Sequence, residues 1–215
     1  ISIESAEYTS VLHDIANLRV PTREPIRALF KLRLRSHNLP FQRLGLKTLP
    51  LFLPGSDETS ARLYEQLVAN ARGLVLRWGP RMQRNSAFAA DARPVRPLGF
   101  APEQRLLPCS APAFEGHRLL EEYFAFPARF DFVELSGLGD AAARCGSDEL
   151  ELIVPLTRFD PALEGAVHAK RVLLFATLRS TCLRSIAASS PYARTRKSYG
   201  SCLIRHAPAT SSCTH

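Results

Sequence analysis

Long apolar runs are absent from this chain of 215 residues, although 46% of its residues are hydrophobic and 22% are charged. No run approaches the roughly 18 apolar residues of a membrane-spanning helix. The first residues, ISIESAEYTS, lack the basic and apolar regions of a signal peptide. We therefore expect a cytoplasmic protein without membrane insertion. The length suffices for one ordinary domain with a hydrophobic core.

Close cysteine pairs and catalytic motifs are absent as well. None of the five cysteines has CxxC spacing, which predicts reduced thiols and no zinc site. The sequence contains no HExxH, no phosphate-binding glycine loop and no GxSxG elbow. His117 and Glu121 lie four residues apart, but two ligands are too few for a metal, so we expect an exposed helical pair. The sequence predicts no enzyme, no cofactor and no metal.

Acidic residues are missing from residue 177 onward. Of the 28 lysines and arginines, six lie in this segment: Arg179, Arg184, Arg194, Arg196, Lys197 and Arg205. The residues before it carry 22 basic against 20 acidic side chains and are close to balanced. The charge thus divides the chain into a body, residues 1–176, and a basic, serine-rich tail, residues 177–215.

Residues 98–138 combine a proline-rich loop, an amphipathic helix and an aromatic strand. Proline at 108 and 112 delays regular structure until Phe114 or Glu115. Four apolar residues then share one helical face: Leu119, Leu120, Tyr123 and Phe124. The other face carries Glu115, Arg118, Glu121 and Glu122. We expect the apolar face to dock, so that Phe124→Ala costs roughly 3–5 kcal/mol and Glu122→Ala far less.

Pro127 cannot continue this helix and disfavours the helical state at Phe126. The chain is expected to turn there and to extend as a strand from Phe130 to Leu135. Ser136 and Gly137 then end the strand. The aromatic corner around Pro127 is predicted to join helix to sheet.

The remaining pattern predicts a strand-rich body. Strands are expected over 28–35, 43–53, 74–78, 149–154 and 171–177, with Pro50 marking an edge or a bend. A second amphipathic helix, capped by Ser56 or Asp57, ends near Gly73. Loops are expected over 79–97 and 140–147, and Asp160 opens a short helix. Strands do not alternate regularly with helices, which favours an α+β fold with two main helices packed on sheet.

The string FEGHRLLEEYFAFPARFDFVELSGL resembles the central signature of the TssF family, also called ImpG or VasA, a type VI secretion baseplate subunit. The resemblance assigns a structural role to Phe114, Gly116, Arg118, Leu119, Leu120, Glu122, Tyr123, Phe124, Phe126, Pro127, Phe130, Leu135 and Gly137. LYEQLVANARGLVLR and the stretch 149–177 are also similar to family segments. The body would then be a central piece of such a protein, incomplete at both ends.

This resemblance implies a non-catalytic scaffold. It would assemble in the cytoplasm with TssG into a wedge, in which it would also self-associate. It would also meet TssK and the sheath and spike components of a contractile apparatus. No specific nucleic-acid partner is implied.

The tail departs from the family pattern. The family's run after a VLLFAT-like strand resembles TPAVNLF, whereas this chain continues with LRSTCLR. One inserted base in a permissible codon string for residues 177–188 restores a family-like sequence. We therefore interpret residues 177–215 as an out-of-frame, disordered tail. The alternative is a genuine basic tail with some affinity for nucleic acid.

A group of arginines surrounds the single tryptophan of the chain. It consists of Arg72, Arg77, Trp78, Arg81 and Arg84. This combination is typical of single-strand binders and also of protein interfaces, in which arginine and tryptophan are enriched. Because the body lacks an extended basic footprint, we favour an interface. A nucleic-acid-binding module is the alternative.

Overall fold

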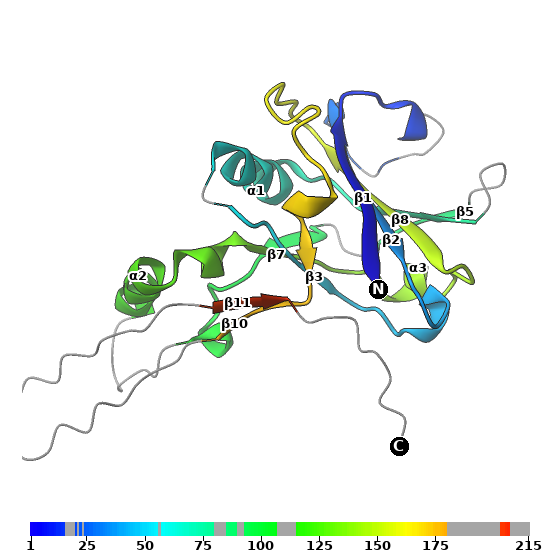
Figure 1. Cartoon of the computed structure of the whole chain (residues 1–215). Coiled ribbons are helices and arrows are strands. Elements are labelled where there is room, and N and C mark those ends of the chain that lie inside the picture. Colours follow the sequence, from blue (N-terminus) through cyan, green and yellow to red (C-terminus); the bar gives the residue numbers. More distant parts are fainter. Residues whose placement is uncertain are drawn as a thin grey trace, which may run out of the picture.

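The structure is a computed structural model that describes residues 1–15, 20, 22, 24–55, 57–79, 85–89, 93–106, 115–179 and 203–206. Its strands form two larger antiparallel sheets and a separate two-stranded sheet, and its α-helices are few (Figure 1). Strands and helices do not alternate regularly along the chain. This is the α+β architecture predicted from the sequence.

The larger sheet has five strands in the order β1-β2-β8-β4-β5. They are β1 (Ser2–Thr9), β2 (Ala28–Arg35), β8 (Glu149–Leu156), β4 (Val75–Trp78) and β5 (Asn85–Phe88). The predicted alternation of β2 is confirmed, since Phe30, Leu32 and Leu34 are fully buried. Ile153, expected on the polar side of its strand, is also buried because it packs in a second small cluster with Leu29 and Val75.

The second sheet has four strands in the order β6-β7-β3-β9. They are β6 (Val95–Pro97), β7 (Phe132–Leu135), β3 (Leu49–Phe52) and β9 (Leu173–Leu174). Pro50, expected at an edge or a bend, therefore lies in an inner strand, in which it pairs only with β7. The sheet tolerates it because β9 pairs only with Leu51 and Phe52 and does not reach the proline.

Helix α1 (Glu58–Asn70) follows the prediction closely. Asp57 is the N-cap, and its carboxylate accepts a hydrogen bond from the Ser60 amide at 3.1 Å. Leu63 and Leu67 are buried in a core shared by both sheets. Gly73 follows the helix with a φ of 138°, a conformation that favours glycine.

Helix α2 (Glu115–Ala125) begins and ends where the sequence predicts, while Phe114 lies outside the described residues. Pro127 then occupies the first turn of the 3-10 helix η4 (Pro127–Asp131). Proline suits this position because it lacks the N–H that a first turn leaves unpaired. The following strand therefore begins at Phe132 and not at Phe130.

Four connections differ from the prediction. The expected loop 79–97 contains strands β5 and β6, and the loop 140–147 overlaps the short helix α3 (Gly139–Ala142). Residues 161–166 form turns and no helix. The strand expected over 171–177 is interrupted, because Phe175 adopts a φ of 55° between β9 and β10 (Ala176–Arg179). The sequence pattern does not predict this interruption, because a left-handed backbone conformation is rare for phenylalanine.

Strand β10 pairs with β11 (Leu203–His206), which lies within the predicted tail. Most other tail residues lie outside the described part of the chain. The remaining short elements are 3-10 helices: η1 (His13–Ile15), η2 (Phe41–Arg43), η3 (Pro102–Gln104) and η5 (Ala169–Arg171).

Candidate assembly surface around helix α2

Helix α2 presents to solvent the face that the sequence predicted to be buried. Leu120 is 59% exposed, Tyr123 54% and Phe124 80%. Arg118 and Glu122, expected on the solvent side, are 4% and 0% exposed. The predicted orientation of the helix is therefore wrong, and so is the expected ranking of Phe124 above Glu122 as a stabilising residue.

The reversal has a physical cause in an ionic cluster beneath the helix. The Glu122 carboxylate accepts hydrogen bonds from Arg118 Nη1 at 2.8 Å and from the Leu106 amide at 2.9 Å. Nη1 of Arg129, itself buried, lies 3.1 Å from the same carboxylate. A buried carboxylate is tolerated when it is paired and hydrogen-bonded in this way.

The two arginines also hold the loop that precedes the helix. Arg118 Nη2 donates to the Phe100 carbonyl at 3.2 Å, and Arg129 Nε and Nη2 donate to the Gly99 carbonyl at 3.1 and 3.0 Å. Arg129 also donates to the Gln104 carbonyl. Burial lowers the pKa of the Arg129 guanidinium, while the charge of Glu122 opposes that shift. The cluster thus ties η4, α2 and the loop into one unit.

Gly99 allows the loop to approach this closely. Its φ is 99°, and a Cβ at this position would lie 3.1 Å from the Arg129 carbonyl oxygen and 3.3 Å from the Arg129 side chain. The Gly99 amide donates to Gln104 Oε1 at 2.7 Å. A side chain at position 99 would strain both the backbone and the guanidinium contacts.

Four aromatic rings form a continuous row on the outside of this unit. Centroid distances are 5.1 Å for Phe100 and Phe130, 5.8 Å for Phe130 and Tyr123, and 5.7 Å for Tyr123 and Phe124. These separations fall within the range of favourable ring pairs. We call Phe100, Leu120, Tyr123, Phe124 and Phe130 the aromatic patch. In Figure 1 its helix lies at the margin of the molecule.

The other signature residues support the fold. Phe126 and Leu135 are buried in the interior, and Gly116 and Leu119 are half-buried. Gly137 has a φ of 76°, as suits a residue that ends strand β7. The signature therefore divides into core residues, buried ionic residues and the outward aromatic patch.

The structure describes three residues of the predicted arginine group: Arg72, Arg77 and Trp78. Arg72 Nε lies 3.2 Å from Glu24, and Arg77 Nη1 lies 2.8 Å from Asp14. Arg81 and Arg84 lie outside the described residues. Burial alone would raise the pKa of Asp14, but hydrogen bonds from Lys31 and Arg77 outweigh it and hold the pKa at about 2. The described arginines are thus already paired with carboxylates.

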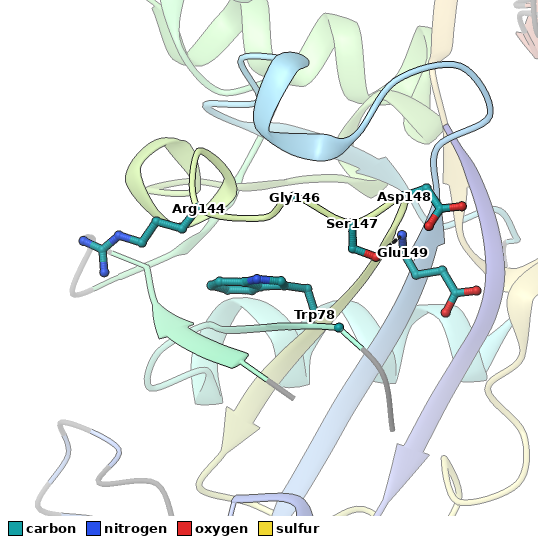
Figure 2. A pocket seen from close by; sticks show the side chains of 7 residues that line it. Trp78, Arg144, Gly146, Ser147, Asp148 and Glu149 are labelled. Atoms are coloured by element: carbon teal, nitrogen blue, oxygen red, sulfur yellow. Dashed lines mark hydrogen bonds between the residues drawn. The ribbon is translucent and has the colours of Figure 1, made fainter. Parts of the chain in front are cut away.

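Trp78 lines an open pocket of about 580 Å³ with residues of the α3–β8 connection. Figure 2 shows the flat face of its indole beneath this connection, with Arg144 on one side and Asp148 on the other. Glu149, which also lines the pocket, forms an ion pair with Arg35. Among the described residues, the charged lining of this pocket consists of one arginine, Arg144, and two carboxylates, Asp148 and Glu149.

Sequence reasoning missed the partners of Glu122. The sequence pattern gave no indication that Arg129, Gln104 or Gly99 would contact the elements around Glu122. The available signal was the i,i+4 pair of Arg118 and Glu122, which indicates two charges within reach of each other but not their burial. Among the described residues, no three His, Cys, Asp or Glu side chains are grouped to hold a metal ion. Within that same part of the chain, no helix is long and apolar enough to cross a membrane.

Comparison with known proteins connects this fold to a family. Residues 1–177 match the family described as Type VI secretion system, TssF. The type VI secretion system component TssF1 of Pseudomonas aeruginosa is 45% identical over 166 residues, which cover 74% of this chain and 26% of that protein.

A solved structure has a similar fold. It is a chain of the type VI secretion system TssK-TssF-TssG baseplate subcomplex, determined by cryo-electron microscopy. The TM-score is 0.61 at 23% identity, over 86% of this chain and 34% of that chain. The present chain therefore spans about a quarter of the curated relative and about a third of the solved chain.

The described residues form an α+β fold with an exposed aromatic patch around helix α2. The chain belongs to the TssF family of the type VI secretion system, because the family match covers most of its length.

Proposed function

We propose that this chain is part of a type VI secretion baseplate subunit and acts there as a non-catalytic scaffold. The observation that carries the proposal is the family match over residues 1–177, which includes the signature helix and its buried ionic cluster, and the 45% identity to TssF1 supports it. The outward aromatic patch supports it, because a scaffold acts through interfaces and needs no reacting groups.

The proposed partners are TssG and TssK, which accompany TssF in the solved baseplate subcomplex. Contacts with sheath or spike components and self-association within a wedge belong to the same proposal, as does a cytoplasmic setting. Arg72, Arg77, Trp78, Arg81 and Arg84 are proposed as a secondary contact region. The pocket beside Trp78 supports this assignment, since tryptophan is common at interface centres.

Co-purification tests the proposed function. The full chain is co-expressed with tagged TssG and, separately, with tagged TssK from the same secretion system. We expect retention with at least one of them through size-exclusion chromatography. A variant for comparison is Glu122→Ala. This substitution disrupts the unit beneath the aromatic patch and should abolish retention. A chain that elutes apart from both subunits would contradict the scaffold assignment.

We also propose that residues 177–215 are translated out of frame. The family match ends at residue 177, where the sequence departs from the family pattern. The acidic residues end at the same region, which supports the division. Sequencing the DNA across the codon for Thr177 tests this proposal: a single-base deletion is expected, and an intact frame shared by close relatives would contradict it.

A further inference from the structure

The aromatic patch is large for a surface that remains in water. Phe100, Leu120, Tyr123 and Phe124 are 46%, 59%, 54% and 80% exposed. With about 200 Å² for each large side chain, these fractions leave roughly 500 Å² of mainly apolar surface. Patches of several hundred Å² on soluble domains usually mark binding sites. The patch therefore needs a partner surface to cover it.

The protein holds these side chains outward with a rigid base. Glu122 pairs with Arg118 and Arg129 directly beneath the helix, and both guanidinium groups are anchored to backbone carbonyls of the preceding loop. Rotating α2 to hide Phe124 would expose Glu122 and break these bonds. The patch is thus preorganised, and docking on it costs little conformational entropy.

The charges around the patch indicate the chemistry of its partner. Glu121 is exposed on α2, one residue from Leu120 and three from Phe124, and Glu103 is exposed in the loop next to Phe100. Arg105 is an exposed cation of the same loop. Two exposed carboxylates against one cation favour a partner with basic side chains at the edge of its apolar face.

We propose that the aromatic patch docks an amphipathic helix of a different protein. Aliphatic side chains of that helix would contact the four rings, and its flanking lysines or arginines would face Glu121 and Glu103. This mode is a helix packing its apolar stripe on an apolar surface. The inference rests on the proposed function, since the partner would be a neighbouring baseplate subunit.

A second copy of this chain fits the patch less well. Two patches meeting face to face would bury roughly 1,000 Å² in total, the lower limit for a specific interface. A two-fold axis near Phe124 would also place each Glu121 about one helical turn from the axis, so that the two carboxylates lie within about two turns of each other. Like charges at that separation oppose self-association.

The test measures affinity of the full chain for purified TssG and for purified TssK, at low and at high salt. We expect Phe124→Ala to weaken binding of one subunit at least tenfold, and Glu121→Lys to weaken it severalfold at low salt but less at high salt. Phe88→Ala is the matched control, because Phe88 is 37% exposed on the edge strand β5, away from the patch. This control should bind like the parent chain.

A photo-crosslinking phenylalanine analogue at position 124 identifies the occupant. Crosslinks to aliphatic residues of one helix with nearby lysines or arginines support the proposal. Crosslinks to another copy of this chain, or to residues of the same chain, overturn it in favour of those occupants. Equal affinity of Phe124→Ala and the parent chain overturns the docking site but leaves the scaffold function standing. A parent chain that binds neither subunit contradicts the proposed function itself.

Discussion

The five-stranded sheet and the corner at helix α2 differ in where their charged side chains lie. On the sheet, Lys31 and Arg33 of β2 lie on the face opposite the buried Phe30, Leu32 and Leu34, and they pair with Asp14 and Glu151 at 2.7 and 3.2 Å. At the α2 corner, Arg118, Glu122 and Arg129 are buried, whereas Tyr123 and Phe124 are exposed. The sheet therefore follows the ordinary rule for a soluble domain, whereas the helix inverts it.

This difference shows what an amphipathic pattern specifies. The period of hydrophobic residues identifies two faces of an element, although the half-buried Leu119 and the exposed Glu121 depart from the division expected for α2. It does not say which face the fold covers, because that depends on partners elsewhere in the chain. For β2 the partners are apolar strands, whereas for α2 they are Arg129 and the carbonyls around Gly99.

The largest expected effect comes from removing the carboxylate at the centre of the inverted corner. Glu122→Ala leaves Arg118 and Arg129 buried without their shared counter-ion, so the free energy of unfolding should fall by roughly 3–5 kcal/mol. Denaturant unfolding measures this change. The control is Glu121→Ala, which changes the exposed neighbour and should stay within about 0.5 kcal/mol of the parent. Similar losses for both variants would contradict the buried cluster.

The second-largest expected effect is a pH-dependent loss of stability when the ion pairs of Asp14 at the five-stranded sheet are removed. The pKa of Asp14 is about 2 in the folded protein, below the roughly 3.9 of an unfolded aspartate. Its contribution to stability is therefore present above about pH 4 and is lost as the pH falls towards 2.

Asp14→Asn should lower the free energy of unfolding at pH 7 by about 2 kcal/mol. It should also flatten the decline of stability between about pH 4 and pH 2. Unfolding curves at half-unit pH intervals measure both effects. Glu65→Gln, which changes an exposed residue of α1, is the control. An unchanged pH dependence in Asp14→Asn would show that the ion pairs of this face contribute no stability.

A smaller effect on stability is expected from Phe124→Ala, because its ring is mostly in water. The free energy of unfolding should change by less than about 1 kcal/mol. Phe126→Ala, two residues away and buried, should cost roughly 3–5 kcal/mol. Thermal or denaturant unfolding of the pair separates the two predictions. Equal costs would place the Phe124 ring in the core.

The smallest effect concerns nucleic acid. Because Arg72 and Arg77 are paired with carboxylates, residues 1–176 should bind DNA or RNA weakly and without sequence preference. Any binding of the full chain should decline steeply with salt and vanish when residues 177–215 are removed. Filter binding at several salt concentrations tests this expectation. Sequence-selective binding by residues 1–176 at physiological salt would favour the nucleic-acid-binding alternative.

Local patterns predicted the elements whose determinants lie close in sequence. The Asp57 cap of α1, the alternation of β2 and the ends of α2 all depend on neighbours within a few residues. The position of Pro50 in an inner strand was not predictable, since it depends on how far β9 extends from the other end of the chain. Strand β6 was missed for the same reason, as its partner β7 is distant, whereas β5 pairs with the nearby β4 and was missed because its residues were taken for part of a loop.

The candidate site was predicted only as a set of residues. Their grouping in one signature was foreseen, but the burial of Glu122 requires Arg129, the Leu106 amide and a loop shaped by Gly99. None of these contacts leaves a periodic signal. A sequence-based prediction assumes that the polar face of a helix points to solvent. This assumption fails where the interior of the fold supplies charged partners for that face.

Hydroxyl-radical footprinting of Phe124 and Phe126 tests the central claim most directly. The two rings belong to one aromatic corner, yet one is 80% exposed and the other 1%. In the free chain Phe124 should be oxidised rapidly and Phe126 barely, and addition of the baseplate subunit that binds should protect Phe124. Protection of Phe124 in the free chain, to the level of Phe126, would contradict the outward orientation of helix α2.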